Sequence, residues 1–172
     1  MTKKDLQIQL HQCHKQFAGY LNALSPEEFS RVAHGKWTAG QQLDHIVKSV
    51  VPLAQVLPNK GFIQEKFGAL ERPGLNFEAL VKTYKKALEG GGKATGKFVP
   101  EAITITQRDE RNTTLLEAIN TIVHVLQQYS EAELDALTIP HPLLGKLSIR
   151  EMLYFSIYHV GHHQEHLQKN LV

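Results

Sequence analysis

Histidines gather near the C-terminal end of the sequence, where His159, His162, His163 and His166 lie within one short segment. Imidazole nitrogens are common ligands of zinc and related transition-metal ions. His159 and His163 are spaced i, i+4, so a helix would place both rings on one face and offer two nitrogens to one ion. His162 and His166 lie nearer the edge of that face. The cluster therefore suggests a metal site whose third ligand comes from elsewhere in the chain.

The segment 148–169 is predicted to be one long helix that carries these histidines. Ser148 and Glu151 form a capping box at its start, and no proline interrupts it. His159 and His163 fall within its broad apolar arc, which packs against a core. A buried histidine can also be a hydrogen-bonded core residue, and histidines near a helix C-terminus complement the helix dipole. Both alternatives stay open for any single histidine, and the inner-face pair favours a ligand role.

Apolar residues that recur every three or four positions predict further helices at about 3–24, 38–57, 76–88 and 114–129. In the second of these, His45 lies at the edge of the apolar arc, where a lone histidine is usually partly exposed. Counted from the caps of their helices, His45, His159 and His163 lie close to whole numbers of helical turns. A bundle that pairs the second helix with the last one could bring the three together.

The remaining segments are predicted to be connections. Residues 59–75 indicate a long crossover with one helical turn at 62–67, and 139–145 indicate an extended linker. Gly91 to Lys97 has the G-x-x-x-x-G-K spacing of a phosphate-binding loop, but Phe98 replaces the required Ser or Thr, so nucleotide binding is not expected. Cys13 belongs to the apolar stripe of the first helix and is interpreted as a small hydrophobic residue.

Composition is that of an ordinary globular chain. The 172 residues suit a single domain, 1–172, with a net charge of +2 and 42% hydrophobic residues. The small, dispersed charge argues against a nucleic-acid partner, and no apolar run is long enough for a membrane span. One cysteine excludes an intramolecular disulfide, and the N-terminal segment lacks a signal-peptide pattern. We therefore expect a cytoplasmic location.

Three stretches resemble the DinB-like superfamily: Gly35 to Thr38 followed by His45, the run from His141 to Gly145, and the H-x-x-x-H segment of the last helix. The resemblance implies an all-α four-helix bundle, up-up-down-down with a long crossover. It also implies a divalent metal site with three histidine ligands. Carried over by position, these ligands are His45, His159 and His163.

The same resemblance implies a range of functions. The family includes transferases that use low-molecular-weight thiols such as bacillithiol or mycothiol, and other members labelled metal-dependent hydrolases. Three hypotheses follow: a metal-dependent thiol transferase acting on a small electrophile, a metal-dependent hydrolase, and a non-enzymatic helical bundle with a structural site. Zinc or nickel suits the imidazole ligands best, with copper also compatible. The catalytic residues, the roles of His141, His162 and His166, and homodimer formation are left open.

Overall fold

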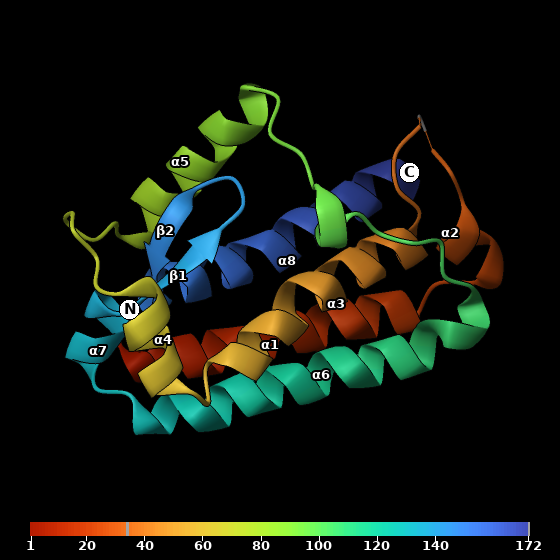
Figure 1. Cartoon of the computed structure of the whole chain (residues 1–172). Helices are drawn as coiled ribbons and strands as arrows, with labels where there is room; N and C mark the ends of the chain where they lie inside the picture. Colours follow the sequence, from red (N-terminus) through yellow and green to blue (C-terminus); the bar gives the residue numbers. More distant parts are fainter. Residues whose placement is uncertain (34, 172) are drawn as a thin grey trace.

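The computed structural model describes residues 1–33 and 35–171, and most of these residues are helical. Four long helices lie side by side as a bundle (Figure 1). They are α1 (Lys3–Asn22), α3 (Ala39–Val56), α6 (Arg108–Val125) and α8 (Ile149–Leu171). The predicted four-helix bundle is confirmed.

The helices run up, down, down and up in chain order, which corrects the expected up-up-down-down order. Arg150 at the start of α8 donates a hydrogen bond to the Met1 carbonyl at 2.9 Å, so α1 and α8 begin at the same end. Asn112 near the start of α6 donates to Asn22 at the end of α1 at 2.7 Å, so these two helices are antiparallel. The short connection through α2 (Pro26–Ser30) reverses the chain before α3. Only the connection from α3 to α6 then has to travel the length of the bundle.

That crossover is longer than predicted, because the helix predicted at 76–88 forms part of it. It contains α4 (Lys60–Phe67) and α5 (Phe77–Glu89), followed by the 3-10 turns η1 (Gly96–Phe98) and η2 (Ile105–Gln107). The predicted helical turn at 62–67 is therefore part of α4. In Figure 1, α5 lies on the side of the bundle away from α6, and the chain then passes over α3 towards the start of α6.

A small antiparallel sheet corrects the expectations of an extended linker and of a protein without strands. Strands β1 (Thr138–His141) and β2 (Gly145–Ser148) pair with Thr138 opposite Ser148 and His141 opposite Gly145. Gly145 has a φ of +71°, which favours glycine at the end of the turn. The hairpin leads directly into α8, next to α5 (Figure 1).

The helix predicted from Thr114 begins earlier, at Arg108. Thr114 donates its hydroxyl to the carbonyl of Glu110, four residues back, and therefore lies inside α6 rather than capping it. The predicted apolar seam is nevertheless correct. Its members are all buried: Leu115, Ile119, Ile122, Leu126 and Tyr129.

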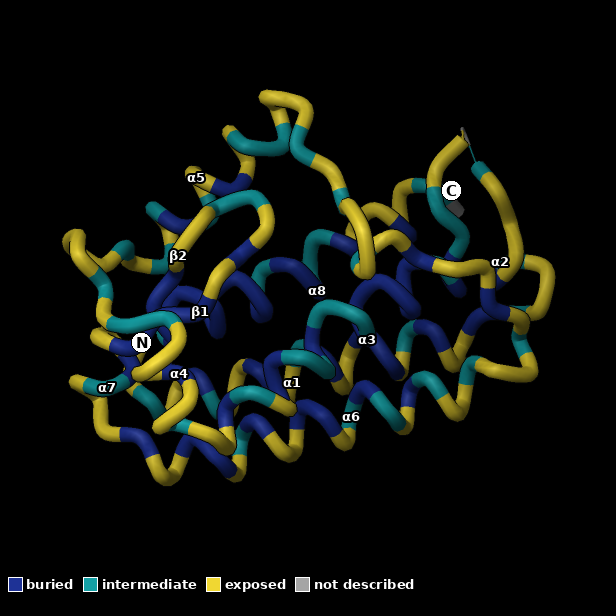
Figure 2. The backbone as a smooth tube through the Cα atoms, in the orientation of Figure 1, coloured by how far each residue is buried: buried dark blue, intermediate teal, exposed yellow. Residues whose placement is uncertain are grey.

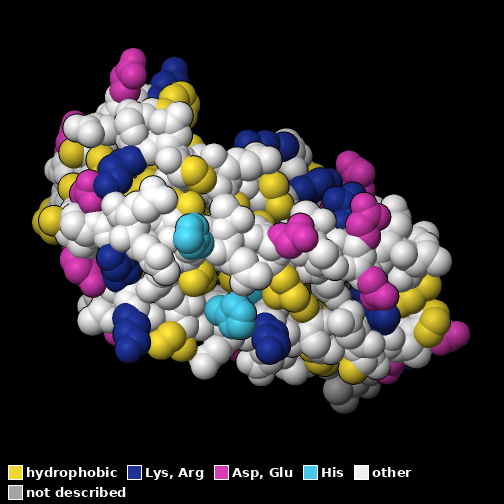
Figure 3. Space-filling model, turned by 90° about the horizontal axis from the view of Figure 1, so that it is seen from below, with side chains coloured by type: hydrophobic (Ala, Val, Ile, Leu, Met, Phe, Trp, Pro, Cys, Tyr) yellow, Lys and Arg dark blue, Asp and Glu magenta, His cyan; other side chains and the backbone are white. Residues whose placement is uncertain are grey.

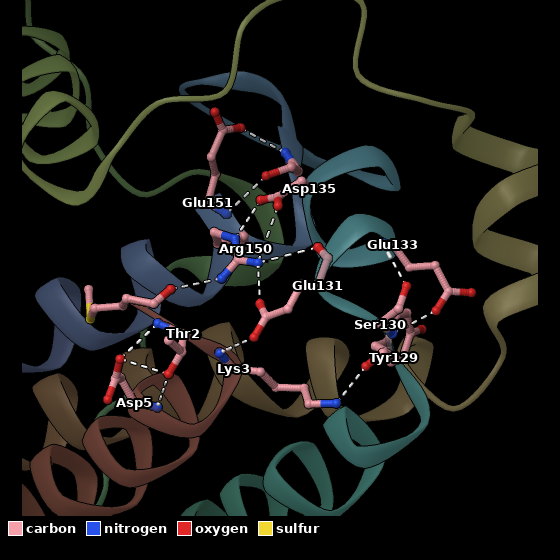
Figure 4. Close-up of polar contacts among 12 residues, drawn as sticks. Thr2, Lys3, Asp5, Tyr129, Ser130, Glu131, Glu133, Asp135, Arg150 and Glu151 are labelled. Carbon is pink, nitrogen blue, oxygen red and sulfur yellow. Dashed lines mark hydrogen bonds and ion pairs between the residues drawn. The ribbon is translucent and has the colours of Figure 1, made fainter.

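Buried positions run along the inner faces of all four long helices, while α4, the tip of α5 and the crossover are largely exposed (Figure 2). One hydrophobic core joins the four seams. At the end where α8 begins, Arg150 contacts Glu131 and Asp135 of α7 (Glu131–Ala136) and the main chain of Met1 (Figure 4). The face seen in Figure 3 carries side chains of both charges, interspersed. None of the described helices is long and apolar enough to cross a membrane.

Candidate metal centre

Three buried histidines meet between α3 and α8. His45 comes from α3, and His159 and His163 come from successive turns of α8. The Nε2 atom of His159 lies 3.2 Å from Nε2 of His45 and 3.0 Å from Nε2 of His163. One nitrogen from each ring lies within 4.8 Å of the other two, and each residue is at most 6% exposed. The structure thus brings together the three histidines that the sequence singled out.

The outer nitrogens of two rings are held by protein oxygens. His45 donates Nδ1–H to the Phe98 carbonyl at 2.7 Å, and His163 donates Nδ1–H to Oε1 of Gln42. Because a neutral imidazole carries one ring proton, each of these two rings presents an unprotonated Nε2 to the centre of the cluster. Metal-binding histidines are usually oriented by such hydrogen bonds at the second nitrogen.

The close approach of these ring nitrogens is suited to a bound cation. His159 can supply at most one Nε2–H between two neighbouring lone pairs, so at least one buried lone pair is left facing another nitrogen. Burial first, and then the neighbouring histidines, lower the pKa of His159 and of His163 well below the usual range; burial also lowers the pKa of His45. All three rings are therefore neutral at pH 7, the form that binds a metal ion.

Two aromatic rings flank the cluster. The Trp37 ring lies nearly parallel to His163, with centroids 6.2 Å apart, and 5.0 Å from the His45 ring. On the other side, the Phe155 ring stacks on His159 at 4.6 Å. These apolar walls limit the water around the imidazoles and strengthen electrostatic interactions inside the cluster.

A cavity of about 300 Å³ opens on the cluster. His45 and His159 form part of its wall, and most of the remainder is apolar, from α3, α5, the hairpin and α8. Among the described residues, the charged side chains that line it are Lys93 and Lys97, with no Asp or Glu. This volume suits a small organic molecule in contact with two of the three histidines.

Comparison with known proteins agrees with the fold. The sequence model of the DinB superfamily matches residues 9–167, which is most of the chain. The chain belongs to the DinB superfamily. A solved structure, described as TT2238, a four-helix bundle protein, is similar with a TM-score of 0.59 and 18% identity over 98% of this chain and 99% of that one. It supports the fold. Among curated proteins, none matches significantly.

The structure also places the other residues considered from the sequence. His45 itself is buried rather than at a surface rim, because the crossover covers it. The rings of His162 and His166 are 4.1 Å apart, and His166 is exposed. Cys13 is partly buried, and burial raises the pKa of its thiol to about 12, in agreement with its interpretation as a hydrophobic residue.

Sequence reasoning missed the residues that hold the histidines. Gln42 lies one helical turn before His45 and is buried; the signal in the sequence was a polar residue at the spacing of the apolar face. In the sequence, Phe98 stands where a phosphate-binding motif requires Ser or Thr. In the structure, Gly91 to Lys97 follows α5 and leads into η1, without the strand and helix of a phosphate-binding loop. The Phe98 carbonyl instead orients His45.

Hydrogen bonds and an ion pair that involve charged side chains hold the segment that carries Phe98 against α3. Asp44, beside His45, accepts a hydrogen bond from the backbone N–H of Glu101 at 2.8 Å. Lys48 pairs with Asp44 at 2.8 Å and donates to the Val99 carbonyl at 3.1 Å. These contacts position the Phe98 carbonyl over His45 and close one side of the cavity.

Proposed function

We propose that this DinB-superfamily chain is a metal-dependent enzyme that transfers a low-molecular-weight thiol to an electrophilic small molecule. The observation that carries the proposal is the cluster of neutral, buried imidazoles opening on a mainly apolar cavity. A divalent ion held by His45, His159 and His163, with zinc or nickel best suited, would supply Lewis acidity and lower the pKa of a bound thiol. The histidines add no negative charge that would reduce this effect.

The lining of the cavity favours a thiol over water as nucleophile. Among the residues described in its wall there is no carboxylate to act as a general base. A free thiol, with a pKa of about 8.5, is already close to ionisation at neutral pH, whereas free water, with a pKa near 16, would depend wholly on the metal ion to become a nucleophile. Thiol transfer therefore needs less help from a general base in the cavity wall than hydrolysis does.

The thiol has to be supplied by a second small molecule. Cys13 lies on α1 and remains protonated at neutral pH, since burial raises its pKa to about 12. The apolar cavity wall would exclude water around the electrophile, while the histidines fix where the thiol sulfur binds. We therefore expect a reaction with two small substrates and no covalent enzyme intermediate.

The test compares wild type with His163→Ala and, as a control, His124→Ala on the exposed face of α6. We expect His163→Ala to lose bound metal, because one ligand is removed from a site that needs three. Thiol-dependent consumption of an electrophile should be lost with it, while the helix content stays unchanged. His124→Ala should keep both. Metal analysis, circular dichroism and assays with several small thiols measure these effects.

Two outcomes would contradict the proposal. Transfer at the wild-type rate by metal-free His163→Ala would remove the metal from the mechanism. Thiol-independent turnover of an ester or amide by the wild type, lost in His163→Ala, would instead support hydrolysis.

A further inference from the structure

His141 is a third histidine in the cavity wall, and the hairpin fixes its tautomer. It lies at the end of β1, where Nδ1 accepts hydrogen bonds from the backbone N–H groups of Leu143 at 3.2 Å and Leu144 at 3.1 Å. Backbone N–H groups can only donate, so Nδ1 must carry the lone pair. The ring proton of neutral His141 is therefore on Nε2.

That proton lies in a mainly apolar environment without a protein acceptor. The residue is 8% exposed and lines the cavity, and Nε2 makes no hydrogen bond to any residue that the structure describes. The Phe155 ring lies 4.3 Å from His141 and 4.6 Å from His159, so it separates His141 from the histidine cluster. A polar group in such surroundings lowers its free energy by gaining a partner.

The charges of the cavity indicate what kind of partner fits. Lys93 and Lys97 line it and are exposed, and no acidic side chain does so among the described residues. The cavity therefore combines apolar walls, one fixed neutral donor and positive charge. This combination favours a ligand with an acceptor oxygen, and a carboxylate over a neutral group.

We propose that His141 recognises the substrate of this cavity by donating Nε2–H to a carbonyl or carboxylate oxygen of a small molecule with an apolar body. The proposal rests on the proposed function only in treating the cavity as the substrate site. In this scheme His141 selects the ligand, and the three clustered histidines hold the ion that binds the thiol sulfur. The two roles are separated by Phe155, so they can be tested separately.

The test uses three probes of similar shape: 3-phenylpropanoate, 3-phenylpropanamide and propylbenzene. Their affinities are measured by NMR titration of the protein as purified, and again after chelation, because a carboxylate could also coordinate a metal ion. Wild type should bind the acid and the amide at least about tenfold more tightly than the hydrocarbon, as expected for one buried hydrogen bond. The preference should survive chelation.

The decisive variant is His141→Asn, with His124→Asn as control. The Asn side-chain oxygen can take the place of Nδ1 and accept from the turn, whereas the donor at the Nε2 position is lost. We expect His141→Asn to bind propylbenzene as wild type does and to lose the preference for the acid and the amide. A melting temperature near that of wild type would show that the hairpin is intact.

Several results would overturn the proposal: equal affinity of wild type for the three probes, no binding of the acid and the amide, or an unchanged preference in His141→Asn. Imidazole ¹⁵N shifts showing the Nδ1–H form of His141 would also contradict it. Measured after chelation, these results do not depend on metal content, so this inference can fail while the His163→Ala test succeeds, and the reverse.

Discussion

Gln42 and the Phe98 carbonyl determine which nitrogen two of the histidines can offer to an ion. Each holds an Nδ1–H, so His163 and His45 present Nε2 to the centre of the cluster. Without these acceptors the rings could rotate or change tautomer, and free energy would be spent on ordering them when a metal binds. The affinity of the site therefore depends on residues that do not touch the ion.

We predict that Gln42→Leu lowers zinc affinity by about 10- to 100-fold, the range found when such outer hydrogen bonds are removed. The change leaves all three histidines in place and puts an apolar side chain of similar size in a buried position. Competition with a chelator of known affinity measures it. Gln55→Leu, on the exposed face of the same helix, is the matched control. Equal affinities of the two variants would show that Gln42 has no part in orienting His163.

The sequence predicted some of these residues and not others, for a physical reason. His159 and His163 belong to one helix, where spacing alone fixes the face they share. His45 was brought in by its spacing from the helix cap and by family resemblance. The contact between His45 and Phe98 joins residues 53 positions apart, through a crossover without helical periodicity. No local pattern reports such a contact, so the Phe98 acceptor appeared only with the structure.

The start of α8 is fastened by one buried carboxylate. Glu151 accepts from Arg72 at 2.7 and 2.9 Å, from the Leu75 N–H at 2.7 Å and from the Ser148 N–H at 2.8 Å. Burial raises the pKa of Glu151, but the hydrogen bonds outweigh it, first those from Arg72, so the pKa is lowered below its usual 4.5. The carboxylate joins the crossover to the helix that carries two of the three clustered histidines.

We predict that Glu151→Gln lowers the free energy of unfolding by about 2 kcal/mol at pH 7, since charge-assisted hydrogen bonds are replaced by weaker ones. A group with a depressed folded-state pKa stabilises fully above its unfolded pKa, and this contribution is lost as pH falls through the folded pKa. The difference between wild type and variant should therefore be constant from pH 7 to about 5 and shrink below 4.5. Urea unfolding at pH 7, 5 and 3 measures it.

The exposed Glu65→Gln serves as the control and should show little difference at any of these pH values. A gap between wild type and Glu151→Gln that stays the same at pH 3 would mean that the ion pair with Arg72 does not stabilise the fold.

The packing of the crossover on α3 depends on a glycine. A Cβ at Gly40 would lie 2.6 Å from the Ile103 carbonyl oxygen, whereas a Cβ at Gly19 in α1 would meet nothing within 4 Å. We predict that Gly40→Ala destabilises the protein by about 1–3 kcal/mol, as overpacking does. It should also weaken zinc binding, since Phe98 lies on the same segment. Gly19→Ala should stabilise by about 0.5–1 kcal/mol through helix propensity alone.

Thermal unfolding and zinc titration of the two variants decide this prediction. Stabilisation by both substitutions would show that the crossover moves freely away from α3, and the positioning of His45 by Phe98 would then lose its support.

Element boundaries were harder to predict than the elements. Thr114 with Glu117 has the sequence of a capping box, yet α6 continues through it, because Thr104 and Gln107 form the capping box that precedes the helix. The hairpin was missed because its strands have four residues each, too few for an alternating pattern, with a proline inside β1. Tertiary packing against α8 stabilises such short strands, and a local pattern cannot report that packing.

The histidine cluster and the stability of the bundle have separate origins. One core runs through all four long helices, whereas the clustered histidines lie between α3 and α8 only. Buried leucines and isoleucines of α1 and α6 form much of that core. The helices therefore have their packing partners before any ion binds, which distinguishes this bundle from small domains that fold only around a metal.

We predict that chelating the metal leaves the helical circular dichroism spectrum unchanged and lowers the melting temperature moderately. An ion that binds only the folded state adds about 2.7 kcal/mol of stability at a free concentration of 100 times its Kd. For a domain of this size, 1 kcal/mol corresponds to roughly 2–4 °C, so readdition of zinc should raise the melting temperature by about 5–10 °C. His163→Ala should show no such rise, because its site lacks a ligand. Loss of helix content in the chelated wild type would instead assign the three histidines a structural role, since the apolar seams alone would then fail to hold the bundle together.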